Sequence, residues 1–473
     1  MSNKPNIVFI HADQLRYDFI GVNGAKFIDT PNIDELAETS VRFTNSFCAS
    51  PLCVPTRNEW LTCMSSIANG VLDNRHFHDP SIKTVPQRFY EHGYFTAAIG
   101  KMHDYPWDLQ DGYRLRILAD DKRHFYLHDD YQDFLQKHGY TRKHAEYAAD
   151  YFENFGAIQS ELPPELQVDV FIGNEAARFM KNNNKQPFYL SVGFAGPHCP
   201  YDPSEDLINK YKPGEMPEPI PDNGLLPKAK AIILNSCQMD WCKLDFRKLT
   251  KDKMLKMRAH YAALVHQIDC QVGKMIESLK EAGQFENTLI ILTSDHGDML
   301  GDYAMPYKHL FFETSIHVPL LVHYPGQNEM MVSDKLVQNG DAIPTMMKSA
   351  GLNIPEEFDL KILPDLPISN RNFVRDYIWG ATDLGVMFRT KDWKLSVYKT
   401  GEMHLANLND DPHEQNDFSD RTECQSILRD LYLVMMREVI DGMQKRNREL
   451  LIPFGDKEIF GKRGWQRPFP WPH

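Results

Sequence analysis

The sequence predicts an α/β fold in which a mainly parallel sheet lies between helices, followed by a smaller C-terminal α+β subdomain. Two observations carry this prediction. Short, continuously apolar strands alternate with helical segments along most of the chain, and hairpin-like strands replace this alternation after about residue 355. The 473 residues allow two or three domains, or one large domain with an appendage. We expect an α/β domain over residues 1–370 and the α+β subdomain over residues 371–473.

Each predicted strand is a short apolar run that ends at polar or small residues. The strands expected in the first domain are Asn6–Ile10, Phe95–Ile99, Pro187–Phe194, Thr288–Thr293 and Val318–His323. In the second domain we expect a hairpin formed by Gly385–Arg389 and Trp393–Tyr398.

The clearest helix is Lys251–Glu281, because apolar residues recur there every three or four positions and Gly283 is placed to end it. Further helices are expected at Asn32–Thr39, Val85–Glu91, Val170–Met180 and Cys424–Lys445. The tail Arg463–His473 is rich in proline and aromatic residues, and it is a candidate to dock on another surface.

The composition excludes several classes of protein. Hydrophobic residues (42%) and charged residues (25%) are close to the globular average, which argues against wholesale disorder. The formal net charge of −13 gives an acidic surface that would repel a phosphate backbone, so nucleic acid is not an expected partner.

The apolar stretch at residues 6–10 is too short for a signal-peptide core, and we interpret it as a strand of the mature fold. No apolar run approaches the roughly 18 residues that would span a bilayer. We therefore expect a soluble, cytoplasmic protein with no membrane partner. Its eight cysteines are sparse for this length, and structural disulfides are not expected in a reducing compartment.

Polar side chains follow the ends of four predicted strands: Asp13-Gln14, Lys101 to His103, His198, and Asp295-His296. In a parallel sheet the carboxyl ends of the strands share one rim, so these groups should lie close together. Carboxylate and amide oxygens with one imidazole suit a hard divalent cation such as Ca²⁺, Mn²⁺ or Mg²⁺. Taken alone, Asp13-Gln14 is better explained by a turn that Asp13 caps, and Asp295-His296 by a loop histidine with an ordinary hydrogen bond. Taken together, the two pairs favour a metal site.

The most informative segment is Cys48–Ser65, where Cys53, Pro55, Thr56 and Arg57 form a C-x-P-T-R string that opens a probable helix. This string resembles the C-x-P-[S/T]-R signature of the type I sulfatases in the alkaline-phosphatase superfamily. Further motifs occur in the family's order over the first 330 or so residues, and within the family the SPLC and GKMH strings resemble the choline sulfatases. These motifs are NIVFIHADQLR, GKMH (Gly100–His103), GPHCPY (Gly196–Tyr201), SDHGDMLGD (Ser294–Asp302) and YKHLFFE (Tyr307–Glu313).

The resemblance assigns roles position by position. It implies that the metal ligands are Asp13, Gln14, Asp295, His296 and residue 53, with Ca²⁺ the first choice. Arg57 would hold the oxygen of the nucleophile, Lys101 and Lys308 would grip the sulfate, His103 would act on the second hydroxyl of residue 53, and His198 would protonate the leaving group. Without the motifs, the two lysines could be solvated residues and the two histidines structural ones.

The implied chemistry depends on Cys53. In the family this cysteine is oxidised to formylglycine by a formylglycine-generating enzyme, and the hydrated aldehyde is the nucleophile. Its second hydroxyl allows the covalent sulfate to be eliminated, whereas a plain serine would stay sulfated. The expected substrate is a small-molecule or saccharide sulfate ester, and a homo-oligomer is left open.

Some positions depart from the family pattern. Asp13-Gln14 and His296 replace the residues of many sulfatases and are more like choline sulfatases and phosphonate monoester hydrolases, and Cys63 stands where the family usually has glycine. Two alternatives stay open: a phosphodiesterase or phosphonate monoester hydrolase, and an unmodified, catalytically silent binding protein. Tyr105, Trp107 and Tyr201, beside the motifs, could line a leaving-group pocket or serve ordinary packing.

Overall fold

The computed structural model describes residues 4–107, 109–124, 126–183, 186–369 and 375–446. The strands are β1 (Asn6–Asp13), β2 (Val41–Phe47), β3 (Phe95–Gly100), β4 (Leu115–Leu118), β5 (Phe188–Pro197), β6 (Thr288–Ser294), β7 (Leu320–His323), β8 (Met331–Gln338), β9 (Tyr377–Thr382), β10 (Gly385–Thr390), β11 (Trp393–Tyr398) and β12 (Met403–Asn407). The α-helices are α1 (Pro31–Ala37), α2 (Cys53–Thr62), α3 (Ser66–Asn69), α4 (Val85–Glu91), α5 (Asp130–Lys137), α6 (Val168–Asn182), α7 (Glu205–Lys210), α8 (Pro227–Cys237), α9 (Lys251–Glu281), α10 (Glu313–Ile316), α11 (Ala342–Ser349) and α12 (Gln425–Arg446).

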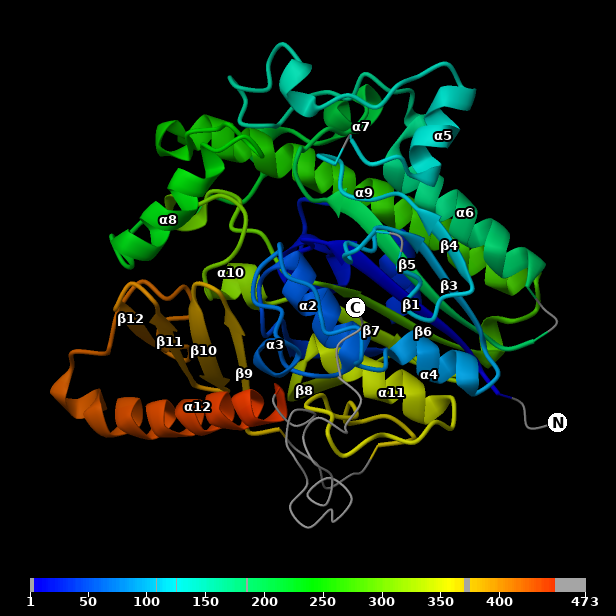
Figure 1. Cartoon of the computed structure of the whole chain (residues 1–473). Coiled ribbons are helices and arrows are strands. Elements are labelled where there is room, and N and C mark those ends of the chain that lie inside the picture. Colours follow the sequence, from blue (N-terminus) through cyan, green and yellow to red (C-terminus); the bar gives the residue numbers. More distant parts are fainter. Residues whose placement is uncertain (1–3, 108, 125, 184–185, 370–374, 447–473) are drawn as a thin grey trace, which may run out of the picture.

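The large sheet has eight strands in the order β4-β3-β5-β1-β6-β7-β2-β8 (Figure 1). All neighbours from β4 to β6 pair in parallel, and so do β2 and β8. Strand β7 runs antiparallel to both β6 and β2. The predicted mainly parallel α/β sheet is therefore confirmed, with β7 as an exception that the sequence did not reveal.

Helices cover both faces of this sheet. Successive side chains of a strand point to opposite sides, so each strand packs against both layers of helices. In β1, Ile7 and Phe9 belong to the apolar cluster that contains Trp60 of α2. Val8 and Ile10 belong to the cluster on the other face, which contains residues of α9. Continuous apolar strands are thus explained by burial on both sides.

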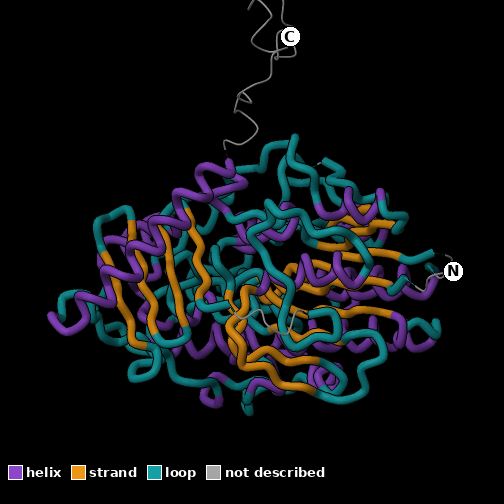
Figure 2. The backbone as a smooth tube through the Cα atoms, turned by 90° about the horizontal axis from the view of Figure 1, so that it is seen from below, coloured by secondary structure: helices purple, strands orange, loops and turns teal. Residues whose placement is uncertain are grey.

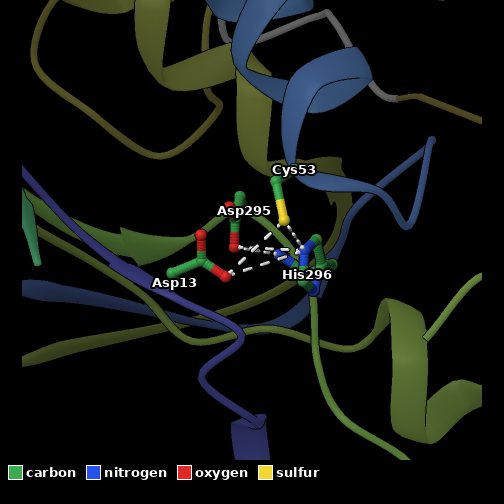
Figure 3. Close-up of side chains that lie close together, drawn as sticks. All are labelled: Asp13, Cys53, Asp295 and His296. Carbon is green, nitrogen blue, oxygen red and sulfur yellow. Dashed lines mark hydrogen bonds and ion pairs between the residues drawn. The ribbon is translucent and has the colours of Figure 1, made fainter. Parts of the chain in front are cut away.

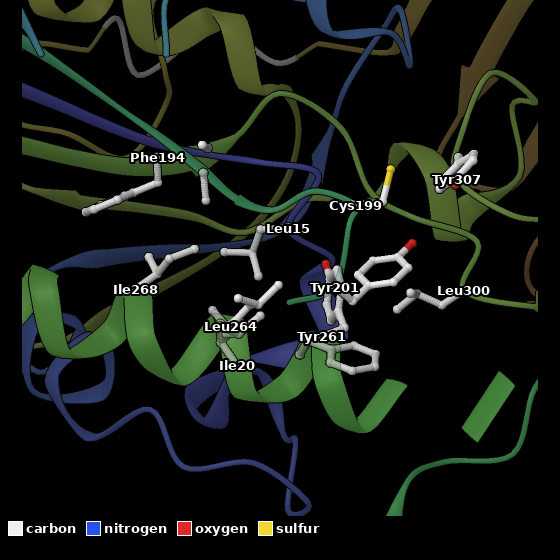
Figure 4. Close-up of a cluster of buried hydrophobic side chains, with 14 of the residues drawn as sticks. Leu15, Ile20, Phe194, Cys199, Tyr201, Tyr261, Leu264, Ile268, Leu300 and Tyr307 are labelled. Carbon is white, nitrogen blue, oxygen red and sulfur yellow. The ribbon is translucent and has the colours of Figure 1, made fainter. Parts of the chain in front are cut away.

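Helix α9 covers the second of these faces, with the bounds that the periodicity predicted. Figure 4 shows Leu264 and Ile268 on the side of α9 that faces the sheet, with Ile268 near Phe194 of β5 and Tyr261 beside Tyr201. The helix ends at Glu281, and Gly283 just beyond it has a φ of +64°, in the left-handed region that glycine adopts readily. No helix in the described ranges is long and apolar enough to cross a membrane.

The C-terminal part forms an antiparallel sheet of order β12-β11-β10-β9, covered by α12 (Figure 2). Its small core joins Phe388, Leu395 and Leu405 of the sheet to Met435 of α12. The predicted hairpin and closing helix are confirmed. The predicted boundary between residues 370 and 371 and the tail Arg463–His473 lie outside the described residues, and both stay predictions.

The small sheet is hydrogen-bonded to the loop that leads into α2 and to the start of α3. The hydroxyls of Ser50 and Ser66 both donate to the carbonyl oxygen of Ala381 in β9, at 2.9 and 2.8 Å. Next to it, a Cβ on Gly380 would lie 2.1 Å from the carbonyl oxygen of Ala49. The close approach of β9 to this loop therefore requires a glycine at position 380.

We expect Gly380→Ala to push β9 away from the Ala49 carbonyl and to destabilise the protein by about 1–3 kcal/mol, the usual cost of overpacking. Thermal unfolding followed by circular dichroism measures this effect. The matched control is Gly214→Ala, since no atom lies within 4 Å of the added Cβ there. An unchanged melting temperature for Gly380→Ala would show that the two segments can separate without cost.

Candidate active site

The carboxyl ends of the parallel strands bring the predicted polar residues to one rim of the large sheet. Asp13 is the last residue of β1, and Lys101, His198 and Asp295 directly follow β3, β5 and β6. These four strands are neighbours in the order β3-β5-β1-β6. The predicted gathering of strand-end residues is therefore confirmed, and all four side chains are buried.

Helix α2 brings residue 53 to this rim. Cys53 and Arg57 are four residues apart and lie on one face of the helix, while Pro55 falls in the first turn, where a missing N–H is tolerated. All ten residues of α2 are buried. The helix ends at Thr62, and the next residue, Cys63, has a left-handed φ of +58°. This conformation explains why a glycine suits the position.

Cys53 lies in a compact cluster with Asp13, Asp295 and His296 (Figure 3). The Cys53 Sγ atom is 3.1 Å from His296 Nε2 and 3.7 Å from Asp13 Oδ1. His296 Nε2 is also 4.0 Å from Asp13 Oδ1 and 3.7 Å from Asp295 Oδ1. One ligand atom from each of the four side chains lies within 4.8 Å of the others.

The second oxygen of each carboxylate faces a cation. Arg57 bridges the two groups, with Nε 3.0 Å from Asp295 Oδ2 and Nη2 3.2 Å from Asp13 Oδ2. Lys101 Nζ lies 2.7 Å from Asp13 Oδ2. Burial alone would raise the pKa of Asp13, but Lys101 and the other cations of the site hold it well below its usual range. The Asp13 carboxylate thus stays ionised, and its Oδ1 atom faces Cys53 and His296, while Asp295 Oδ1 faces His296.

The other two metal-ligating side chains of the cluster, His296 and Cys53, are neutral. Burial lowers the pKa of His296 to about 4. Its Nδ1–H donates to the carbonyl of Gly297 at 2.9 Å, so the Nε2 lone pair faces the cluster. Burial and the Asp13 carboxylate raise the pKa of the Cys53 thiol to about 11. Two carboxylates and a neutral imidazole, with residue 53 beside them, form a donor set that fits a divalent cation.

Gln14 and Lys308 meet at the edge of the cluster. Lys308 Nζ donates to Gln14 Oε1 at 2.5 Å, and the amide nitrogen of Gln14 donates to Asp298. Tyr201 donates to the same carboxylate at 2.7 Å and is fully buried, so its role is packing and it does not line an open pocket. The predicted ligand role of Gln14 is not tested by these contacts and stays a prediction.

His198 is linked to the site through two residues that the motifs did not reveal. Its Nδ1–H donates to the carbonyl of Cys199 at 2.7 Å, and its Nε2 lies 3.3 Å from Arg123 Nη2. Arg123 pairs with Asp121 at 2.9 Å, and Asp121 pairs with Lys101 at 2.8 Å. The sequence contains a signal that could have identified Asp121: this residue comes shortly after β4, another parallel strand that ends at the same rim.

His103 lies beside the cluster but is not bonded to its thiol. In the part of the chain that the structure describes, its ring makes no hydrogen bond with Cys53. Its backbone N–H donates to Asp120 Oδ2 at 3.1 Å, and its ring stacks on Trp107 with centroids 6.3 Å apart. Burial and the nearby Lys101 ammonium hold the pKa of His103 well below its usual range. The predicted site residues therefore share one region, with His103 at its border.

Comparison with known proteins agrees with the resemblance of the sequence motifs to those of sulfatases. Residues 5–352 match the family described as sulfatase, and residues 301–440 match the C-terminal part of N-sulphoglucosamine sulphohydrolase. The chain is 29% identical to an arylsulfatase of Clostridium perfringens over 92% of this chain and 94% of that protein. It is 30% identical to a choline-sulfatase of Rhizobium meliloti over 75% of this chain and 69% of that protein.

The fold is also found in solved structures. A phosphonate monoester hydrolase of Agrobacterium radiobacter superposes with a TM-score of 0.79 at 21% identity, covering 92% of this chain and 96% of that one. At this identity the likeness concerns the fold, which is alkaline-phosphatase-like as the sequence predicted. The match over residues 5–352, together with the relatives, shows that the chain belongs to the sulfatase family.

Proposed function

We propose that this protein hydrolyses a small or medium organic sulfate ester, with residue 53 as formylglycine and one divalent metal ion, Ca²⁺ in first place. The observation that carries the proposal is the position of Cys53: its sulfur lies within the cluster of Asp13, Asp295 and His296, at the start of a buried helix. Sulfatase relatives support the reaction class. The assignment of Ca²⁺, with Mn²⁺ or Mg²⁺ next, rests on the predominance of oxygen ligands.

The pKa of the Cys53 thiol explains why an unmodified cysteine would serve poorly. With a pKa of about 11, roughly one thiol in ten thousand is ionised at pH 7. The thiolate is the nucleophilic form, so in the metal-free site this thiol is a poor nucleophile. A bound divalent ion would favour the thiolate, but a sulfated cysteine would still lack the second hydroxyl through which the hydrate releases sulfate. Oxidation to the aldehyde replaces the thiol with a hydrate whose oxygen can attack sulfur. Maturation by a formylglycine-generating enzyme and a cytoplasmic location stay predictions.

The cations of the site provide the binding energy for an anionic ester. Arg57, Lys101 and Lys308 lie around residue 53, where a sulfate oxygen can accept charge-assisted hydrogen bonds from them. The divalent ion would add Lewis-acid stabilisation of negative charge on oxygen. Asp121 pairs with the Lys101 ammonium at 2.8 Å, in addition to the pair that this lysine forms with Asp13, and we assign Asp121 as a positioning residue for this lysine.

His198 is placed to assist the leaving group. Its Nδ1 is fixed on the Cys199 carbonyl, so Nε2 is the atom that would carry the transferred proton, in place of the hydrogen bond that it now accepts from Arg123 Nη2 at 3.3 Å. Burial, together with the Lys308 and Arg123 cations, keeps the pKa of His198 well below its usual range. A bound sulfate monoester brings negative charge into this pocket and opposes those cations, which favours the protonated ring.

A phosphorus ester is the second candidate, because Asp13-Gln14 and Asp295-His296 match the pattern expected of phosphonate monoester hydrolases as well as choline sulfatases. A panel of choline sulfate, an aryl sulfate, a sulfated monosaccharide, an aryl phosphodiester and a phenylphosphonate monoester separates the two. We expect the highest kcat/KM on one of the sulfates. Faster turnover of both phosphorus esters than of every sulfate would favour the second candidate.

Removal of one charged ligand should abolish metal binding and turnover together. We expect Asp295→Asn to lose the metal and to lower kcat/KM by at least about a hundredfold, since the ion and Arg57 both depend on this carboxylate. Elemental analysis and turnover are measured on the same sample. The matched control is Asp430→Asn on the exposed face of α12. Full metal content and full turnover in Asp295→Asn would show that the ligand set is wrong.

The role of His198 is tested with leaving groups of different basicity. Alkyl sulfates leave as strongly basic alkoxides and need a proton, whereas nitrophenyl sulfate leaves as a weakly basic phenolate. We expect His198→Ala to slow an alkyl sulfate by about 10²- to 10⁴-fold and nitrophenyl sulfate much less. Equal losses on both substrates, at unchanged metal content, would remove His198 from the role of general acid.

A further inference from the structure

A second group of metal-ligating side chains lies beside the candidate active site. It consists of His103, Asp120 and His124, and one ligand atom from each lies within 4.8 Å of the others. His124 Nδ1 is already 3.5 Å from Asp120 Oδ1. His103 follows β3, and the other two follow β4, the neighbouring parallel strand. This group shares no residue with the cluster around Cys53.

Two buried nitrogens in this group have no hydrogen-bond partner among the described residues. They are Nδ1 of His103 and Nδ1 of His124, and the second of these has a long ion-pair contact of 3.5 Å with Asp120 Oδ1. His103 is only 2% exposed, so its unbonded nitrogen is shielded from solvent. Buried polar atoms in native proteins are nearly always bonded, and an unbonded one indicates a bound water or ion. A cation held by His103, His124 and Asp120, whose ligand atoms lie within 4.8 Å of one another, would give the His103 nitrogen its missing partner.

Asp120 is able to contribute a ligand atom despite its existing contacts. Its Oδ2 accepts the backbone N–H of His103 at 3.1 Å, and its Oδ1 accepts the backbone N–H of Asp121 at 2.6 Å. Each carboxylate oxygen has a second lone pair, so one metal bond can be added without breaking either contact. The hydrogen bond from the His103 backbone N–H to Asp120 also holds His103 in its left-handed conformation, with a φ of +58°.

Aromatic packing orients the two imidazoles toward the same space. Trp107 stacks on the His103 ring and meets the His124 ring edge-on, with centroids 6.3 and 5.1 Å apart. The two imidazoles themselves meet edge-on at 5.4 Å. Zinc–nitrogen bonds are about 2.0–2.1 Å long, so the group has to contract slightly around an ion. His124 can make this movement because it lies at the outer side, with its side chain 16% exposed.

We propose that this group is an inhibitory site for a zinc-class ion, Zn²⁺ first and Cu²⁺ or Co²⁺ next. Two imidazoles and one carboxylate are the ligands of such borderline ions, whereas the cluster around Cys53 is richer in oxygen. An ion bound here occupies a lone pair of His103 and prevents that ring from accepting a proton from residue 53. The inhibition rests on the proposed function; the binding of zinc does not.

The test compares His124→Gln with the intact protein and with His128→Gln, a matched change of an exposed histidine. Full-length enzyme in calcium-containing buffer is dialysed against Zn²⁺, and zinc and calcium are measured per chain. We expect one zinc in the intact protein and in His128→Gln, none in His124→Gln, and equal calcium in all three. In His124→Gln the inhibition constant for Zn²⁺ should rise about 10- to 100-fold, while turnover without zinc stays within about twofold.

Equal zinc uptake in His124→Gln and the intact protein, or zinc that only displaces calcium, would overturn the proposal. If His124→Gln is poorly folded, His124→Phe replaces it, because a phenyl ring keeps the packing on Trp107 but cannot bind a metal. Zinc uptake is measured without substrate. A protein that takes up zinc through His124 but hydrolyses no sulfate would therefore refute the proposed function and leave the metal site standing.

Discussion

The structure around the active site depends on one buried guanidinium. Arg57 joins Asp13 of β1 to Asp295 at the end of β6, and all three side chains are almost completely buried. Ionised carboxylates are costly to bury unless a cation pairs with them, so the position of α2 on the sheet is fixed by charge as well as by packing. The same geometry delivers Cys53, one helical turn earlier, to the cluster of metal-ligating atoms.

This constraint continues along the rim in the order of the strands. The Arg57 Nη1 atom donates to the backbone carbonyl of Lys101 at 2.8 Å, and Lys101 in turn lies between Asp13 and Asp121. Asp121 holds Arg123, which approaches His198. Alternating charges therefore connect residues after β6, β1, β3 and β4. A change at one position is expected to move its neighbours, because a buried charge cannot lose its partner without cost.

Much of this could be predicted from the sequence, since buried parallel strands and a long amphipathic helix have strong apolar patterns. The rule that ligands bind at strand ends then brought Asp13, Lys101, His198 and Asp295 together. Strand β4 was missed because its apolar run is only four residues long, is interrupted by Arg116 and is only half-buried, and Asp121 and Arg123 were missed with it. Pairing direction is not encoded in composition, so the antiparallel β7 could not be foreseen either.

The central claim is that residue 53 acts only after oxidation to formylglycine, whose hydrate has the second hydroxyl through which the covalent sulfate is released. The most direct test is mass spectrometry of the peptide that contains residue 53, on preparations made with and without a formylglycine-generating enzyme, with turnover measured on each. The account predicts that sulfate-ester turnover per chain rises in proportion to the fraction of formylglycine and vanishes in Cys53→Ala. Full turnover from a preparation that carries only the unmodified thiol would contradict it.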